Sequence, residues 1–450
     1  HWETADSYAA SKVIVATSDT IDGDYEVQGI FRPGAGEVTT EHEDPTYEGT
    51  DGLWGYGSRD FTVFKDPDSD AAYLFSTEDH ENMRVYRLTD DYTDVVLESS
   101  YRLFAGGHRE APAVVKIDGR YFVMTSGQSG WYPNQTRVGS TTDLSDPDGW
   151  SDLSLVGNNS SFYSQPTNII TVEGEGGERS YLYMGDRWNS KKLGTSTYVW
   201  LPLEIDGTDV NLTYQPGWSF DPVTAAITTP RVDLVSQGQP ATASSEVTPA
   251  SAANDGIVTN TNLSGDSTNY WQPDGAPASW QVDLGEAKDL ARVDLSWRSW
   301  NGSETRSTYS VLGSLDGVTW ERIAQRESNR LVAFTTDDLT GSYRHVRVDI
   351  SSVINDHNGN AAPWASGLVE VQVYAEAGPE PISFVDVTQG DQFFTEISWL
   401  ARAGISTGWV AADGTREFRP VTPIARDAMA AFLYRLQGSP DVELPATSPF

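Results

Sequence analysis

The stretch from 113 to 124 decides the fold of the first half of the chain. It consists of Ala113-Val114-Val115-Lys116, then Asp118-Gly119, then Tyr121-Phe122-Val123-Met124. Two short runs of β-branched and aromatic residues on either side of a turn signal predict two strands joined by a turn. The same device occurs at 61–75 and again at 168–184, and Val13-Ile14-Val15-Ala16 is a further expected strand. The sequence therefore predicts a β structure from Trp2 to about Pro222.

A polar residue stands just before the first strand of each of these three units. The residues are Asp60, Glu110 and Gln165, which are 50 and 55 positions apart. A period near 50 with about four strands per unit is typical of a β-propeller, whose first strands line a central channel. Three polar side chains would then converge on the channel, as glycoside hydrolysis requires of its acid and its water-orienting group. The alternative is that each residue only caps its blade.

The short sequence motifs around these residues resemble those of glycoside hydrolase family 43, and most closely those of its exo-β-1,3-galactanase branch. They occur in order as Ser58-Arg59-Asp60, Arg109-Glu110-Ala111-Pro112-Ala113, Gly130-Trp131-Tyr132-Pro133-Asn134, Ser164-Gln165-Pro166-Thr167 and Tyr183-Met184-Gly185-Asp186-Arg187-Trp188. The resemblance covers residues 1–222 and implies a five-bladed β-propeller.

The same resemblance implies roles for single residues. Glu110 matches the general acid, and Asp60 the carboxylate that raises the acid's pKa and positions it, as a nearby like charge does. Gln165 matches a glutamine that holds the attacking water in an inverting reaction. For such a pair we expect roughly 6.5–9.5 Å between the two groups across the channel. Sugar contacts are expected from Tyr8, Ser129, Trp131, Asn134 and Asp186, the last being either a contact or a turn residue.

A second β region is expected at 231–376, after a linker rich in Thr and Pro from Thr224 to Pro230. Its alternating runs, among them the separate expected strands 281–284 and 291–297, predict a β-sandwich or jelly roll. Ala253-Asn254-Asp255-Gly256, Trp280-Gln281-Val282-Asp283-Leu284-Gly285 and Ser314-Leu315-Asp316-Gly317-Val318-Thr319-Trp320 resemble the discoidin-like, or coagulation factor type C, fold that carbohydrate-binding module family 32 shares.

This second resemblance implies a structural calcium near Asp255, with Glu370 as a further carboxylate ligand, because Ca²⁺ prefers oxygen ligands. The alternative is an Asp-Gly turn and an exposed Glu on a strand. Trp300 and Trp364 lie in polar loops and are candidates for stacking on a sugar, unless they are buried.

In the third region, 382–450, the period becomes helical. Phe393, Phe394, Ile397, Leu400 and Ala401 form one face of a helix that Gly404 ends, and Pro423 starts a second helix with Ile424, Ala428, Phe432 and Leu436. Phe384-Val385-Asp386-Val387, Gly404-Ile405-Ser406-Thr407-Gly408 and Phe418-Arg419-Pro420 resemble S-layer-homology-like repeats, which implies attachment to a bacterial cell wall or S-layer polymer. The alternative is a small helical domain with no role at the wall.

Composition excludes several function classes. The net charge of −35 argues against nucleic acid as a partner, because phosphate binding needs a basic face. There is no Cys, hence no disulfide and no thiolate zinc site, and no apolar run is long enough to span a membrane. The reaction itself calls for no cofactor. The expected location is extracellular, secreted and associated with the cell wall.

The leading hypothesis is a multidomain hydrolase that releases galactose from the β-1,3-galactan of arabinogalactans. The alternatives are another family 43 activity, such as α-L-arabinofuranosidase or β-xylosidase, and a carbohydrate-binding or adhesion protein without catalysis. Only three whole units and part of an earlier one are apparent, and 446–450 reads as the opening of another repeat. We therefore expect a fragment at both ends, an open propeller, and little galactanase activity from these 450 residues alone.

Overall fold

The computed structural model describes residues 1–4, 7–37, 54–78, 81–258, 269–299, 305–377, 383–388, 390–411 and 414–438. The fold is mostly β with few helices, and the chain divides into two compact units, His1–Ala375 and Glu376–Phe450.

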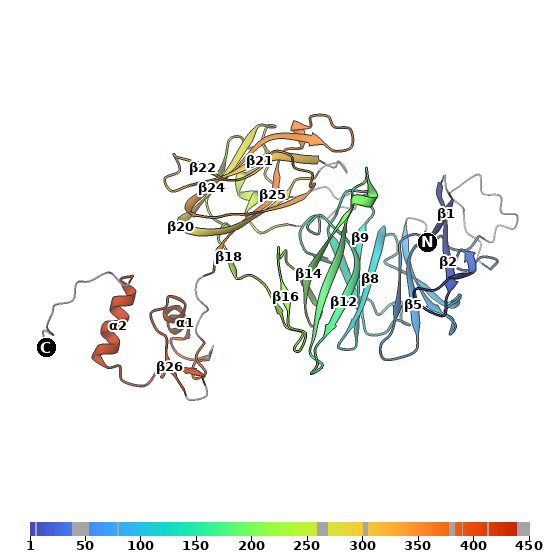
Figure 1. Ribbon diagram of the computed structural model, residues 1–450, viewed down its shortest axis with the longest axis horizontal. Helices are drawn as coiled ribbons and strands as arrows, with labels where there is room; N and C mark the ends of the chain where they lie inside the picture. The colour runs from blue at the N-terminus through green and yellow to red at the C-terminus, as the bar shows by residue number, and fades with distance from the viewer. Residues whose placement is uncertain are drawn as a thin grey trace. The chain divides into compact units, whose positions relative to one another are not determined.

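Four antiparallel sheets follow one another in chain order in the first unit (Figure 1). The first contains β1 (Trp2–Thr4), β2 (Ser7–Thr17) and β3 (Glu26–Phe31). The second contains β4 (Phe61–Lys65), β5 (Ala72–Glu78), β6 (Asn82–Leu88) and β7 (Val95–Leu103). The third contains β8 (Arg109–Ile117), β9 (Arg120–Gly127), β10 (Thr136–Thr141) and β11 (Ser154–Val156). The fourth contains β12 (Gln165–Glu173), β13 (Arg179–Arg187), β14 (Thr197–Asp206) and β15 (Asp209–Leu212), and a short pair, β16 (Ser219–Phe220) and β17 (Ile227–Thr228), follows it.

Each of the last three sheets starts with one of the strands that the sequence predicts, and its strands pair in chain order. β8 lies between β4 and β12 and contacts both. The sheets pack through apolar side chains, because alternate residues of each strand point to one face. Phe75 and Met83 of the second sheet form a buried cluster with Val123 of the third. Phe122 of the third sheet belongs to a second cluster with Tyr183 of the fourth. The first strands of neighbouring sheets are thereby held side by side.

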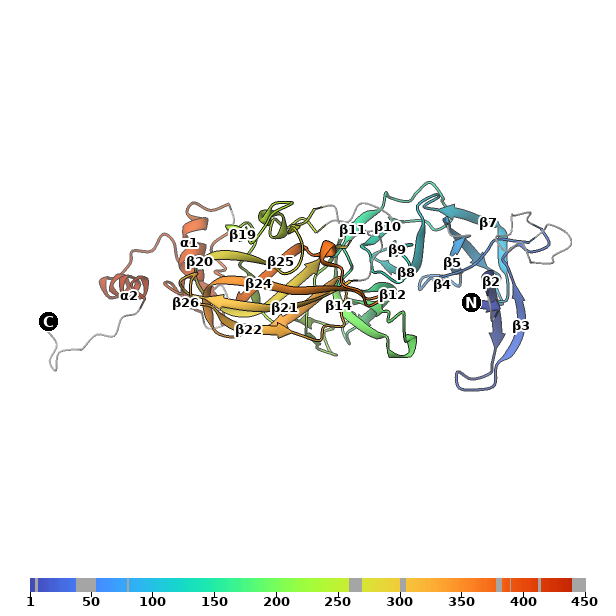
Figure 2. The ribbon, with the colours of Figure 1, turned by 90° about the horizontal axis from the view of Figure 1, so that it is seen from above.

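The rest of the first unit forms two further sheets that share one long strand. β20 (Ala278–Trp297) pairs with β19 (Ala241–Ala243) and β24 (Ser342–Asn355) through its first part, up to Asp289. From Leu290 on it pairs with β23 (Phe334–Asp338) and β25 (Leu368–Glu376). The remaining strands are β18 (Val232–Leu234), β21 (Thr305–Ser314) and β22 (Glu321–Arg326). Figure 2 shows β20, β24 and β21 running alongside one another.

The sequence predicts two separate strands, 281–284 and 291–297, where the structure has the single strand β20. The register shifts between Asp283 and Lys288, and Gly285 takes a φ of 82° there. Such a bulge bends a strand without ending it, so β20 passes from one sheet to the other. Trp280, Leu295 and Val371 are among the fully buried side chains between the sheets.

The second unit contains α1 (Phe394–Arg402), β26 (Trp409–Val410), β27 (Arg416–Glu417) and α2 (Arg426–Leu436). Gly404, with a φ of 66°, follows the end of α1 as expected. Two details differ from the prediction. Phe393 precedes the helix in a left-handed conformation and is exposed, and α2 starts at Arg426 rather than at Pro423. Ile397 and Ala401 of α1 pack with Phe384, whereas the described side chains of α2 include no buried residue.

Candidate active site

Glu110 and Gln165 lie at the same edge of the structure because they occupy equivalent places on neighbouring strands. Glu110 is the second residue of β8, and Gln165 is the first residue of β12. A β-bulge follows each of them, between Glu110 and Ala113 and between Pro166 and Asn168. Bulges re-aim a side chain at a strand end, and proline is tolerated there because it needs no ladder hydrogen bond. The local sequences Glu-Ala-Pro and Gln-Pro-Thr fit this geometry.

The two side chains are joined by direct hydrogen bonds. Gln165 Nε2 donates to Glu110 Oε1 at 3.0 Å and to Ser126 Oγ at 2.9 Å. Trp188 Nε1 donates to Gln165 Oε1 at 2.8 Å. Both ends of the Gln165 amide are therefore satisfied, and this fixes which end faces Glu110.

The Glu110 carboxyl is held in its protonated form at neutral pH. Burial raises its pKa to about 8, and the negative charge of Asp60 adds to this effect. Three smaller effects lower this pKa without compensating for the increase: the positive charge of Arg109, the hydrogen bond that Gln165 donates, and the positive charge of Arg59. Desolvation and a neighbouring like charge are the two ordinary ways to keep a carboxylic acid neutral near pH 7. Glu110 can therefore donate a proton near neutral pH.

The expected separation of Glu110 and Gln165 across a channel is wrong for this structure. Their side chains are in hydrogen-bond contact at 3.0 Å. The reason is topological, because β8 and β12 are the first strands of adjacent sheets and contact each other directly.

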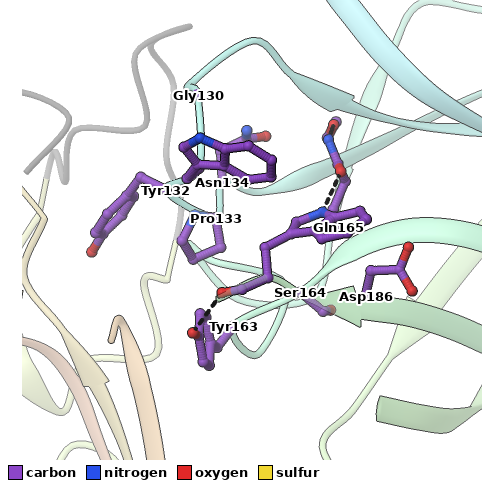
Figure 3. A pocket seen from close by; sticks show the side chains of 11 residues that line it. Gly130, Tyr132, Pro133, Asn134, Tyr163, Ser164, Gln165 and Asp186 are labelled. Atoms are coloured by element: carbon purple, nitrogen blue, oxygen red, sulfur yellow. Dashed lines mark hydrogen bonds between the residues drawn. The ribbon is translucent and has the colours of Figure 1, made fainter. Parts of the chain in front are cut away.

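A cleft of about 300 Å³ opens beside these residues. It is lined by side chains of both signs of charge together with one Trp: His1, Arg59, Asp60, Gln165, Asp186 and Trp188. A smaller hollow adjoins it, and Gln165, Asp186 and Trp188 line both. In Figure 3, Gln165 and Asp186 lie on one side of this hollow, with Asn134, Pro133 and Tyr132 on the other. Trp131, which is 44% exposed, packs edge-on against Trp188 with ring centroids 5.8 Å apart.

The expected sugar-contact residues fall into three groups. Trp131 and Asp186 line the hollow, and burial raises the Asp186 pKa. Asn134 also lines it, but its amide is engaged with the backbone of Gly127 and with Ser129 Oγ, which favours a role in shaping the turn. Ser129 Oγ in turn donates to Tyr132 O at 2.6 Å. Tyr8 lies in β2, and its side chain is outside the described part of the structure.

Two residues of the site were missed by sequence reasoning. Ser126 and Trp188 hold Gln165, yet neither was assigned a role. Ser126 stands opposite Glu110 in the β8–β9 ladder, so knowledge of the register would have identified it. Trp188 is part of the Gly-Asp-Arg-Trp word, whose last residue was a usable signal.

The segment before Gln165 has an unusual backbone. Ser161, Phe162 and Tyr163 have φ values of 49°, 57° and 58°. Left-handed conformations cost roughly 1–2 kcal/mol for each non-glycine residue, so surrounding contacts must hold these three. Ser161 Oγ accepts the Thr136 N–H at 2.8 Å, and Tyr163 Oη donates to Trp188 O at 3.0 Å. We call residues 157–164 the left-handed segment.

Gly185 of β13 lies directly against Ser164 of this segment. A Cβ atom at this position would lie 2.7 Å from Ser164 Oγ, a distance that real Cβ atoms essentially never show. The absence of a side chain at 185 therefore allows Ser164, and with it Gln165, to sit against β13.

In the second region, Asp255 and Glu370 are close enough to interact. Glu370 is 1% exposed, and burial followed by the charge of Asp255 raises its pKa to about 8. Gly256 N–H donates to Glu370 Oε1 at 3.2 Å, and Asn269 Nδ2 contacts both oxygens of Asp255. The expectation of an exposed strand Glu as the alternative to a metal ligand is thus wrong. Trp364 is 47% exposed, whereas Trp300 lies outside the described residues.

Within the described ranges, no group of three or more His, Cys, Asp or Glu residues is arranged to hold a metal ion. No helix among these residues is long and apolar enough to cross a membrane.

Comparison with solved structures gives likenesses to galactan-degrading enzymes. An exo-β-1,3-galactanase from Clostridium thermocellum is 28% identical, covering 78% of this chain and 79% of its own, with a TM-score of 0.47. An exo-β-1,3-galactanase from Phanerochaete chrysosporium, crystallised with galactose, is 24% identical, covering 82% and 76%, with a TM-score of 0.49. A family 43 β-1,3-galactosidase with galactodeoxynojirimycin is 28% identical, covering 47% and 69%, with a TM-score of 0.40. All three TM-scores are below 0.5, so the function proposed below rests on the residues of the site.

No curated protein shows significant sequence similarity to the chain. The F5/8 type C domain model matches residues 240–366, which include β20, β21 and β24. The chain therefore carries an F5/8 type C domain after its four successive antiparallel sheets.

Proposed function

We propose that this chain is part of a glycoside hydrolase that releases galactose from β-1,3-galactan. One observation carries the proposal: Glu110, with a pKa raised to about 8, hydrogen-bonds Gln165, and Gln165 lines both the cleft and the adjoining hollow that Trp131 and Trp188 line. A neutral carboxylic acid is the proton donor that a leaving glycosidic oxygen needs, and exposed Trp rings suit stacking on sugars. The five sequence motifs that resemble the exo-β-1,3-galactanase branch point to galactose as the sugar.

The three polar residues take different tasks in this mechanism. Glu110 donates its proton to the glycosidic oxygen as the bond to the anomeric carbon breaks. Gln165 orients the water that attacks the anomeric carbon from the opposite face. Because the amide of Gln165 cannot take up a proton, the attacking water releases its proton to the solvent. Asp60 holds the pKa of Glu110 up until Glu110 has donated its proton. Inversion needs a gap for sugar and water between acid and water-holding group. The sugar must therefore part the 3.0 Å contact between Glu110 and Gln165 when it enters.

The arrangement of the successive sheets supports their interpretation as blades of a β-propeller. Three of them are four-stranded antiparallel sheets paired in chain order, and their first strands β4, β8 and β12 are neighbours. In this interpretation β1 to β3 belong to one further blade, and the cleft beside Gln165 is part of the central channel.

The proposal is tested by product analysis with the purified protein. Incubation with linear β-1,3-galactan should release galactose, and NMR of the initial product should show the α-anomer. Aryl α-L-arabinofuranoside and β-xyloside serve as controls, since faster turnover of either would favour another family 43 activity. Unchanged galactose release by Glu110→Gln would remove Glu110 from its role.

We further propose that the F5/8 type C domain holds a calcium ion at Asp255 and Glu370. Glu370 is buried next to the negative charge of the exposed Asp255, a setting in which a hard cation would be stabilising, with loop carbonyl groups as further ligands. Calcium should raise the thermal midpoint of the chain, and Glu370→Gln should abolish the increase. A midpoint that chelation leaves unchanged would exclude the site.

The attachment of residues 382–450 to a cell wall, and hence a secreted, wall-associated location, is also a proposal. Its support is the resemblance of the motifs in this region to S-layer-homology-like repeats, together with the separate compact unit that these residues form. A pull-down of residues 376–450 with purified bacterial cell walls tests it, and recovery in the unbound fraction would contradict it.

A further inference from the structure

The F5/8 type C domain contacts the left-handed segment, residues 157–164, directly. Asn158 Nδ2 donates to Ser296 Oγ of β20 at 2.9 Å, and Asn159 Nδ2 donates to Trp297 O at 3.4 Å. All four residues are buried. The segment is therefore covered by residues of the F5/8 type C domain that lie 138 positions later in the sequence.

Apolar packing reinforces these hydrogen bonds. Phe162 packs edge-on against Phe334 of β23, with ring centroids 5.3 Å apart, and Phe334 also packs against Tyr214 at 4.8 Å. Phe334 thus belongs to the hydrophobic cluster of the third and fourth sheets, although it comes from the other domain. Val332 and Ala333 form a second cluster with Tyr132, against which Tyr163 packs.

The contacted segment leads straight to the candidate active site. Asn158 Oδ1 accepts hydrogen bonds from the N–H groups of Ser160 and Phe162, so the residue that reaches Ser296 also holds the turn together. Tyr163 Oη donates to Trp188 O, and Trp188 Nε1 donates to Gln165 Oε1. Three consecutive residues in strained conformations, 161–163, end one residue before Ser164 and two before Gln165. Strained backbone persists only where its surroundings determine it.

We propose that the F5/8 type C domain is a positioning element of the active site, in which Ser296 and Phe334 hold the left-handed segment so that Gln165 keeps its place beside Glu110. The domain then contributes to turnover without touching the substrate. Ser296 and Phe334 are positioning residues, because they act through Asn158 and Phe162. For its kinetic part the inference rests on the proposed hydrolase function.

Two variants test the inference, each with the first unit otherwise intact. Ser296→Ala removes the hydrogen bond to Asn158, and Phe334→Ala removes the packing on Phe162. Val348→Ala is the matched control, because Val348 is fully buried in the core of the same domain and is not part of either shared cluster. Ser296→Thr keeps the hydroxyl group and should restore the native behaviour.

The first measurement is hydrogen exchange of the backbone amides of 158–165. Both test variants should speed this exchange at least tenfold, whereas Val348→Ala and Ser296→Thr leave it near the native rate. Native exchange rates in both test variants, or equal acceleration in Val348→Ala, would overturn the inference. This measurement needs no substrate, so it decides the question even if galactanase activity is absent.

The second measurement is turnover of β-1,3-galactan by the purified protein. Loss of the hold on Gln165 should lower kcat about tenfold and change KM less than twofold, because Gln165 is proposed to act on the attacking water. An equal loss of kcat in Val348→Ala would mean that only the stability of the domain matters, and would overturn the positioning role. Absence of turnover in the native protein would instead refute the proposed function.

Discussion

Two carboxyl groups in different regions of the molecule have the same electrostatic setting. Glu110 at the first strand of the third sheet and Glu370 in β25 both have a pKa raised to about 8. Burial is the largest cause for each, and a neighbouring aspartate, Asp60 or Asp255, is the second.

Their surroundings differ in access and in partners. Glu110 contacts the side-chain amide of Gln165 next to a cleft, whereas Glu370 is 1% exposed and accepts a backbone N–H from Gly256. A raised pKa therefore does not identify a catalytic acid by itself. It does so only where a substrate can reach the proton and a second group can hold the attacking water.

The clearest difference between Glu110 and Glu370 should be the effect of their substitution on kcat. We expect Glu110→Gln to lower kcat on β-1,3-galactan by roughly 10²–10⁴-fold, which is the usual contribution of a general acid. Glu370→Gln should leave kcat within about twofold of the native value, because Glu370 cannot reach a substrate. Equal losses in the two variants would show that the comparison is wrong, while calorimetry with galactose should find binding retained in both.

The dependence of folding stability on pH should instead be affected by the two groups in the same way. A carboxyl whose pKa is raised in the folded state contributes stability below its unfolded value of 4.5, and this is lost as pH rises through about 8. Each group should lower the free energy of unfolding by on the order of a few kcal/mol over this range. Glu110→Gln and Glu370→Gln should each flatten the decline of the thermal midpoint between pH 5 and pH 9. Calcium should reduce the decline in the native chain and in Glu110→Gln, with no such effect in Glu370→Gln.

The hydrogen bond from Trp188 fixes the side-chain amide next to Glu110, whereas Glu370 accepts a backbone N–H, and removing the Trp188 donor tests that difference. Trp188→Phe keeps most of the ring but loses the Nε1–H donor, so the Gln165 amide can rotate. We expect kcat to fall about tenfold, the equivalent of one hydrogen bond, with little change in KM. Trp409→Phe, at an exposed position in the second unit, is the control and should be neutral. A larger rise in KM than fall in kcat would assign Trp188 to sugar binding instead.

The smallest expected effect concerns the neighbouring aspartates. Asp60→Asn should lower the pKa of Glu110 and move the alkaline limb of the kcat/KM profile to lower pH, because a like charge is removed. The proton affinity should change by roughly a factor of ten or less, since burial remains the larger cause. Asp255→Asn should leave this limb unmoved. A shift toward higher pH in Asp60→Asn would contradict the assigned electrostatics.

Much of the strand content could be predicted from the sequence. The runs at 61–64, 113–116 and 181–184 all lie in strands, because alternation with turn residues is a local property of the chain. The long strand β20 could not be predicted in the same way, since the Asp-Leu-Gly-Glu stretch resembles a turn. Only pairing with β24 on one side and β25 on the other keeps it extended.

For the candidate site, residue types were easier to predict than distances. Glu110, Asp60 and Gln165 stand out from their place before each unit, but their separation depends on which strands are neighbours. Glu110 and Ala113 also illustrate the effect of a bulge, because strict alternation would put them on opposite faces of β8. Their partners in β9 are Ser126 and Met124, two residues apart and hence on one face. The contacts of Asn158 with Ser296 join distant parts of the sequence and leave no local signal.

Gly185 limits how this sequence can vary. It has no chemical group to offer a substrate, yet any side chain there would collide with Ser164 and push the chain next to Gln165. Related proteins that keep the amide of Gln165 should therefore carry glycine at the place of Gly185, opposite the residue that follows the amide, however far the rest of β13 has diverged. Selection for the reaction would then be visible at a residue that takes no part in it.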